Sequence, residues 1–260
     1  MTAVANPSSG EEEYYEGGKP LTLYEHLAEL RGRLVVTAFG IAATTVFSLL
    51  FTTRVLNFLL IPGREAYPGF KPIYTEPMEN VSVYFEIALI LGLIFAMPII
   101  LYEIFMFVTP ALTRQERRWV FPIVFGAMLF FLLGVGFAYA VALKPALSFF
   151  LNFGNSFATP QIKIGKYIDF VTHLVLWTGL FFETPLVMMG LAALGIVTAK
   201  TFLRLWRYAV VLGFLFAAFV IPSISPLAQT LVAAPIIGLY FIGVLLAWLV
   251  GRGRPQRQWI

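Results

Sequence analysis

Long apolar segments separated by short polar ones are the dominant pattern of this chain. Six such segments fall at about residues 34–53, 81–108, 119–143, 168–194, 208–221 and 227–250. A helix needs about 20 residues to cross the hydrocarbon core of a bilayer, and all but the fifth segment are long enough. The runs are continuously apolar rather than alternating, which argues against a transmembrane β-barrel. The pattern therefore predicts an all-α integral membrane protein with six transmembrane helices.

The fifth segment, Tyr208–Ile221, is short. Its 14 residues would rise only roughly 21 Å as a helix, against a hydrocarbon core of about 30 Å. The turn Pro222–Pro226 joins it tightly to the sixth segment, so the two are expected to form a helical hairpin. A short span thins the bilayer or leaves a concave face.

Lysine and arginine are distributed unequally between the two sides of this predicted topology. Segments 19–33, 114–118, 200–207 and 252–257 carry twelve of them, whereas the two loops 54–71 and 144–166 carry six. Cytoplasmic loops of membrane proteins carry the excess of positive charge. Both termini are therefore expected in the cytoplasm.

Composition supports this class and removes others. Hydrophobic residues make up 59% of the 260 residues and charged residues only 12%, and the mean hydropathy is +0.83. The absence of cysteine excludes disulfides and iron–sulfur sites, and the two histidines, His26 and His173, cannot build a zinc site without several carboxylates nearby, so no cofactor or metal is expected. Residues 1–18 are acidic and polar and are expected to form a disordered cytoplasmic tail, residues 19–250 the transmembrane domain, and residues 251–260 a basic cytoplasmic tail.

The segment before the first span has its own helical signals. Thr22 and Glu25 have the spacing of a capping box. An amphipathic helix at the membrane surface is indicated by the leucines that recur on one face, opposite Glu25, Glu29 and Arg33: Leu23, Leu27, Leu30 and Leu34.

Glu183 is the most unusual residue because it lies in the middle of an apolar span. A charged residue there costs several kcal/mol, so a neutral, hydrogen-bonded or cavity-facing carboxyl is expected. One interpretation is a neutral acid bonded to a backbone carbonyl that Pro185 helps to free. The other is a polar contact for a partner helix or a proton-coupled site. Prolines elsewhere in or near the spans, at Pro98, Pro122 and Pro235, predict kinks repaired by neighbouring groups.

Glu29 and Glu116 are acids flanked by arginines on the predicted cytoplasmic side. Spacing alone favours modest roles, with Glu29 pairing to Arg33 four residues away and Glu116 capping a helix with Thr113. The alternative is a receptor for a cationic ligand. Guanidinium groups bind carboxylates in bidentate fashion, so an arginine-bearing peptide would fit two such acids.

Four further charged residues are expected at the membrane interfaces. Glu86 and Glu103 lie near opposite ends of the second span, and Asp169 and His173 have the spacing of a pair near the start of the fourth. The chain has no nucleophile–base motif, phosphate-binding loop or metal-ligand cluster, so an enzyme is not expected.

The segments together resemble the TatC family, the polytopic core subunits of the twin-arginine protein translocase. The resemblance covers about residues 21–249, and its motifs follow one another in order on the six predicted spans. They are His26–Arg33, Pro98–Tyr102, Phe107–Leu112 with Glu116–Arg118, Gly134–Tyr139, Phe182–Pro185, and Gln229–Leu231 with Ala233 and Pro235.

The resemblance implies a receptor in the plasma (inner) membrane rather than an enzyme. Members of the family have six helices, the fifth and sixth short, in a concave, glove-like bundle with cytoplasmic termini. They bind twin-arginine signal peptides, recruit single-span TatA- and TatB-type subunits into an oligomeric complex, and export folded proteins with the proton-motive force. The implied peptide-binding residues are Glu29 and Glu116, with Arg31 and Phe107 nearby. Glu183 and Gln229 are the implied contacts for partner helices.

The chain departs from the family at two positions. Ser225 stands where relatives often have an aspartate, and Phe241 where they can have an acid, so contacts of those acids are not expected here. A different class of function, a proton-coupled secondary solute transporter built around Glu183, is the alternative. Such transporters tend to have internal repeats, and the two halves of this chain show none.

Overall fold

The computed structural model describes residues 23–108, 120–152, 161–193, 195–220 and 226–251. Every regular element in these ranges is helical, which confirms the all-α prediction, and the β-structure within them is one isolated bridge between Ile73 and Lys163. The predicted tail 1–18, most of the tail 251–260 and the acid Glu116 lie outside these ranges.

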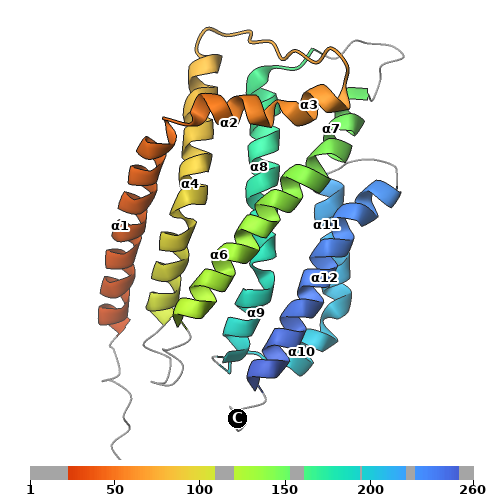
Figure 1. Ribbon diagram of the computed structural model, residues 1–260. Helices are drawn as coiled ribbons and strands as arrows, with labels where there is room; N and C mark the ends of the chain where they lie inside the picture. The colour runs from red at the N-terminus through yellow and green to blue at the C-terminus, as the bar shows by residue number, and fades with distance from the viewer. Residues whose placement is uncertain (1–22, 109–119, 153–160, 194, 221–225, 252–260) are drawn as a thin grey trace, which may run out of the picture.

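Helices α1 (Leu23–Ser48) and α4 (Glu79–Val108) lie side by side along one edge of the bundle (Figure 1). Gly92 permits their close approach, because a Cβ at that position would lie 2.6 Å from the Cα of Thr45. The Thr44 hydroxyl on α1 donates a hydrogen bond of 2.8 Å to the Gly92 carbonyl on α4. The predicted surface helix and the first span are therefore one continuous helix, anchored to the bundle mainly through α4.

Two short helices, α2 (Thr52–Leu59) and α3 (Ile61–Ala66), lie across one end of the bundle, at the top of Figure 1. Apolar periodicity did not predict them. Tyr167 of helix α8 (Ile164–Phe182) holds both in place, since its hydroxyl accepts a hydrogen bond from the Gly63 amide at 3.1 Å and donates one to the Leu59 carbonyl at 2.7 Å.

The third predicted span ends later than residue 143. Helix α6 (Val120–Phe137) passes through a π-helical turn, η2 (Ala138–Ala142), into α7 (Leu143–Asn152). The expected boundary is corrected because the helix continues past Lys144, with Leu147 and Leu151 of α7 buried in the core. The Lys144 ammonium group stays at the surface, where its Nζ atom lies 3.4 Å from Glu65 Oε2. Pro145 lies three residues after this π-helical turn and does not end the helix.

The fourth predicted span begins earlier than residue 168 and is interrupted at Glu183. Helix α8 (Ile164–Phe182) ends there and α9 (Thr184–Ala193) begins directly after it, with Pro185 in its first turn. Helix α8 crosses α6 at two glycines, because a Cβ on Gly134 would lie 2.8 Å from the Cα of Gly179.

The remaining helices are α10 (Ala199–Arg204), α11 (Trp206–Val220) and α12 (Pro226–Gly251). Helix α11 has 15 residues, as the short fifth span predicts. The resemblance implied a short sixth helix as well, and the structure corrects this, because α12 continues through Pro235 for 26 residues. Helix α12 packs against both α9 and α11.

Within the described residues, five helical stretches are long and apolar enough to cross a membrane, and the α11 stretch Trp206–Ala218 is apolar but shorter. The interior of the bundle is filled mainly by α4, α7 and α8, with further side chains from α6 and α12. Many large apolar side chains remain on the outside, as expected for a surface that faces lipid. The start of α1 and the end of α12 lie at the same end of the bundle (Figure 1).

Candidate functional site

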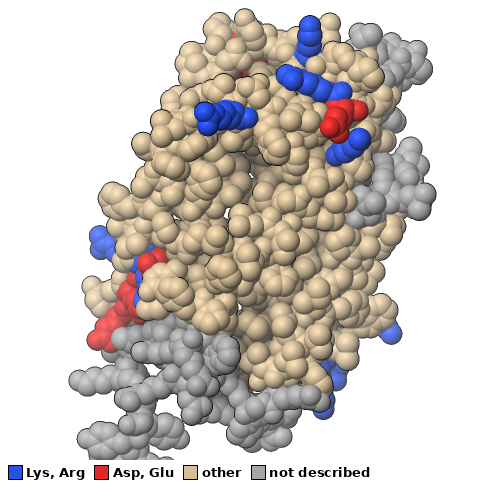
Figure 2. Space-filling model, in the orientation of Figure 1, with Lys and Arg blue, Asp and Glu red and all other residues tan. Residues whose placement is uncertain are grey.

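A cluster of charged side chains joins the first turns of α1 to the last turns of α4. Arg33 donates from Nε to Glu29 Oε1 and from Nη1 to Glu103 Oε2, each at 3.0 Å, and its Nη2 atom also donates to Glu29. We call Glu29, Arg33 and Glu103 the acid–arginine cluster. Figure 2 shows acidic and basic side chains gathered at the lower left, over the lower part of α1.

Helical spacing and partial burial explain the geometry of this cluster. Glu29 and Arg33 are four residues apart on α1 and share one face, while Glu103 faces them from α4. Their side chains are 25%, 21% and 15% exposed for Glu29, Arg33 and Glu103 respectively. Two carboxylates share one guanidinium, so with both acids ionised the cluster carries one uncompensated negative charge.

An aromatic pair lies one helical turn away from the cluster. The rings of His26 on α1 and Phe107 on α4 are stacked, with centroids 4.3 Å apart and planes inclined by 20°. His26 lies three residues before Glu29, and Phe107 lies four residues after Glu103. The structure therefore brings two of the predicted peptide-binding residues, Glu29 and Phe107, to the same helix pair.

Arg31, another predicted site residue, is exposed and lies two positions from both Glu29 and Arg33. Side chains two positions apart do not face each other on a helix, so Arg31 projects away from the acid–arginine cluster. Sequence reasoning placed Glu103 only at an interface. Its partnership with Arg33 was missed because the two are 70 positions apart in the chain.

Most of the described apolar face of the N-terminal part of α1 is directed away from the protein, with Leu30 half-buried at its edge. Leu27 and Leu34 are 63% and 59% exposed, whereas Glu29 and Arg33 pack towards α4. This is the opposite of a soluble amphipathic helix, in which the apolar face is buried. It is expected of a helix that lies against lipid and meets its protein neighbour through paired charges.

Glu183 is buried at the break between α8 and α9. Its side chain is 7% exposed, and its Oε1 atom makes no hydrogen bond to the residues that the structure describes. The predicted carbonyl bond is thus not formed by that oxygen. Helix α9 meets α12 closely here, since a Cβ on Gly243 would lie 3.1 Å from the Cα of Pro185. Gln229, the other predicted partner contact, is half-buried near the start of α12.

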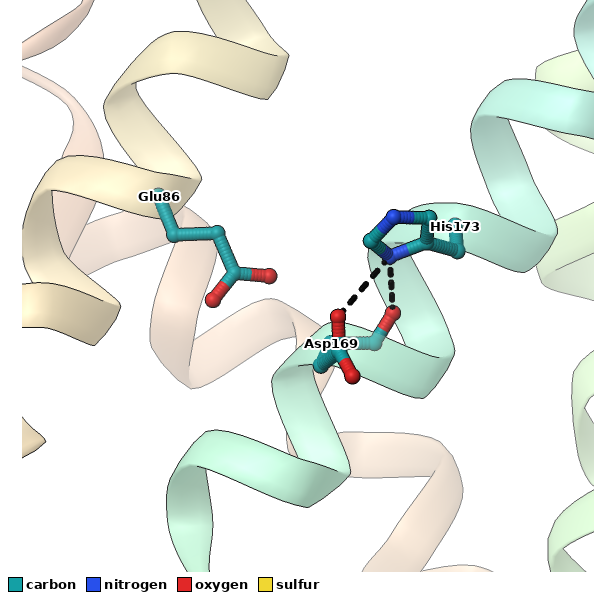
Figure 3. A group of neighbouring side chains, drawn as sticks. All are labelled: Glu86, Asp169 and His173. Carbon is teal, nitrogen blue, oxygen red and sulfur yellow. Dashed lines mark hydrogen bonds and ion pairs between the residues drawn. The ribbon is translucent and has the colours of Figure 1, made fainter.

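A second charged cluster lies towards the other end of α4. Glu86 of α4 and Asp169 and His173 of α8 point towards one another (Figure 3), and their potential ligand atoms all lie within 4.8 Å of one another. His173 Nδ1 is 3.0 Å from Asp169 Oδ1 and 2.7 Å from the Asp169 carbonyl, which confirms the predicted pairing of these two residues. The Thr172 hydroxyl donates to Glu86 Oε1 at 3.0 Å. The side chains of Glu86, Asp169 and His173 are of types that bind metal ions, so this group could hold one.

Comparison with known proteins identifies the family. The sequence profile of TatC, described as Sec-independent protein translocase protein, matches residues 25–235. The chain belongs to the TatC family. It is 37% identical to the chloroplastic translocase protein TATC of Arabidopsis thaliana over 234 residues, which are 90% of this chain and 68% of that protein. It is 35% identical to TatC of Aquifex aeolicus over 241 residues, 92% of this chain and 99% of the relative.

Solved structures agree with this assignment. A crystal structure described as the twin arginine translocase receptor TatC superposes with a TM-score of 0.74 at 35% identity, covering 87% of this chain and 99% of the other. A second crystal structure of that receptor, in the detergent DDM, gives a TM-score of 0.76 at 34% identity. The chain is therefore a component of the twin-arginine, Sec-independent protein translocase, and a solute transporter is not favoured.

Proposed function

We propose that this protein is the cytoplasmic-face receptor for twin-arginine signal peptides and the core of a translocase that exports folded proteins with the proton-motive force. The observation that carries the proposal is the acid–arginine cluster beside the His26–Phe107 stack. It offers carboxylates already arranged to hold a guanidinium, in the half-buried setting where such bonds are strong. The excess of lysine and arginine in the sequence supports a cytoplasmic location for this end and for both termini.

The peptide contacts proposed for this site are Glu29 and Phe107, with Glu116 and Arg31 as further members. Glu29 accepts two hydrogen bonds from the Arg33 guanidinium, which supports its proposed role as an acceptor for a signal-peptide arginine. The stacked rings provide an apolar surface for the residues that follow the arginines. Glu183 and Gln229 are proposed as contacts for single-span TatA- or TatB-type helices. The Glu183 Oε1 atom makes no hydrogen bond to the described residues, and a polar group of a partner helix would satisfy it.

Crosslinking in membranes tests the proposal. A twin-arginine signal peptide carrying a photoreactive residue is expected to crosslink to the wild-type protein and about tenfold less to Glu29→Gln or Glu116→Gln, because each variant loses a charge-assisted bond. Glu65→Gln is the matched control, since Glu65 is an exposed acid at the opposite end that pairs with Lys144. Unchanged crosslinking to both site variants would contradict this assignment.

The orientation is tested separately. The chain contains no cysteine, so single cysteines at Thr201 and Thr75 give unambiguous labels at the two ends. An impermeant thiol reagent added to intact cells is expected to label Thr75→Cys and not Thr201→Cys. The reverse pattern would place the acid–arginine cluster on the wrong side for a cytoplasmic receptor.

A further inference from the structure

We propose that Arg33 is a resident guanidinium that occupies the acid pair of the empty receptor, and that an arginine of the bound peptide displaces it. The inference rests on the proposed function. Arg33 uses three of its nitrogens to bond Glu29 and Glu103, on two different helices. These are the bonds that a peptide arginine would make, so the chain supplies its own stand-in for the ligand.

Charge balance explains why a ligand with two arginines can displace this residue. Arg33 neutralises only one of the two carboxylates that it contacts. A peptide with adjacent arginines brings two positive charges and leaves neither carboxylate uncompensated. A ligand with a single positive charge merely replaces the charge of Arg33, and the two carboxylates keep the same net negative charge.

The surroundings of Arg33 allow it to leave. The side chain is 21% exposed, and its α1 neighbours Leu27 and Leu34 face outward into the region of the lipid. A long arginine side chain can keep its stem along an apolar surface while its charged head reaches the membrane interface. The displaced guanidinium can therefore bind lipid phosphate, and no buried charge is left without a partner.

Displacement has a consequence that a purely structural role lacks. Every cationic ligand must replace the same guanidinium, so Arg33 lowers the affinity for all of them by one common factor. Cations that bind the two acids more weakly than Arg33 does therefore do not displace it. Removing Arg33 is therefore expected to tighten binding, whereas removing a structural or peptide-binding arginine would weaken it.

The test measures peptide affinity with the full-length protein in lipid nanodiscs. Arg33→Gln is expected to tighten binding of a twin-arginine signal peptide about fivefold, and binding of its lysine–lysine counterpart by the same factor, because a partly exposed ion pair is worth up to about a factor of five. Arg204→Gln, which removes an exposed positive charge from α10 at the same end, controls for overall charge. Weaker or unchanged binding to Arg33→Gln would overturn the inference.

Chemical rescue distinguishes displacement from a disturbed fold. In Arg33→Ala, added methylguanidinium should fill the vacant position and weaken peptide binding back towards the wild-type value. The same reagent should have a smaller effect on the wild-type protein, and sodium chloride at equal ionic strength should not reproduce the difference. Equal responses of the two proteins would overturn the inference.

Glu29→Gln separates this inference from the proposed function. If Glu29→Gln and Glu116→Gln both bind the peptide like the wild type, the receptor site itself is wrongly placed. If Glu29→Gln loses binding while Arg33→Gln gains none, the site stands and the resident guanidinium is refuted. Arg33→Lys keeps the charge but lacks the planar donor set, and it should fall between wild type and Arg33→Gln.

Discussion

The two charged clusters on α4 have the same arrangement of residues but differ in their cation and in their exposure. In each, an acid of α4 lies beside an i, i+4 pair on a neighbouring helix. Glu103 lies beside Glu29 and Arg33 of α1. Glu86 lies beside Asp169 and His173 of α8. The two α4 acids are seventeen positions apart, which in a helix is roughly 25 Å, close to the thickness of the hydrocarbon core.

The cation makes the difference between them. Arg33 is permanently charged and reaches both acids, so its cluster is held together across two helices and is mostly covered. His173 pairs with Asp169, and Glu86 accepts a hydrogen bond from the Thr172 hydroxyl instead. His173 is 58% exposed and Asp169 is 49% exposed. The first arrangement suits recognition of another guanidinium, whereas the second is a loose, solvated group.

The largest effect is expected from separating α1 from α4. In Gly92→Ala the new methyl group would lie within 2.7 Å of the Thr45 backbone, so the helices must move apart. We expect a loss of about 1–3 kcal/mol in stability, measured by thermal unfolding in detergent, together with loss of peptide binding. Gly238→Ala is the control, because a Cβ there meets no atom within 4 Å. Equal stability of the two variants would show that α1 does not depend on this contact.

An intermediate effect is expected from neutralising the two α4 acids in turn. Glu103→Gln should weaken binding of a twin-arginine peptide about tenfold, since one of the two carboxylates loses its charge. Glu86→Gln makes the same chemical change on the same helix and should leave the affinity unchanged. Equal losses in the two variants would mean that charge on α4, rather than the acid–arginine cluster, governs binding.

The smallest effect is expected at the exposed pair. Asp169→Asn should change the stability by no more than about 0.5 kcal/mol, because solvent screens an ion pair whose members are half exposed. Thermal unfolding of the variant beside the wild type measures this change. A loss of more than about 2 kcal/mol would show that the second cluster is as important to the fold as the first.

Local patterns predicted much of the fold because apolar length and helical spacing are local properties. The α11 span was predicted short, and the Glu29–Arg33 and Asp169–His173 pairs follow from i, i+4 spacing alone. The errors occur where tertiary contacts override a local signal. Helix α7 continues past Lys144 because its apolar face, with Leu147 and Leu151, is buried against the core, and α2 and α3 depend on Tyr167 from a distant helix.

The amphipathic pattern of early α1 shows the same limit. Leu27 and Leu34 are exposed and Leu30 is half-buried, and the pattern does not say whether protein or lipid covers such a face. In a bilayer the apolar side chains need no protein partner, whereas the charged ones do. The charged face of α1 is consequently the one that packs against α4.

The sequence alone determined that this is a helical membrane protein of the TatC family, because apolar spans and ordered motifs are written in the chain itself. It also determined that two acids, Glu25 and Glu29, are followed closely by two arginines, Arg31 and Arg33, on α1. Only the tertiary structure decided which of them meet, because Glu103 reaches Arg33 through the packing of two helices at Gly92. That packing turns an ordinary i, i+4 pair into two acids that share one guanidinium.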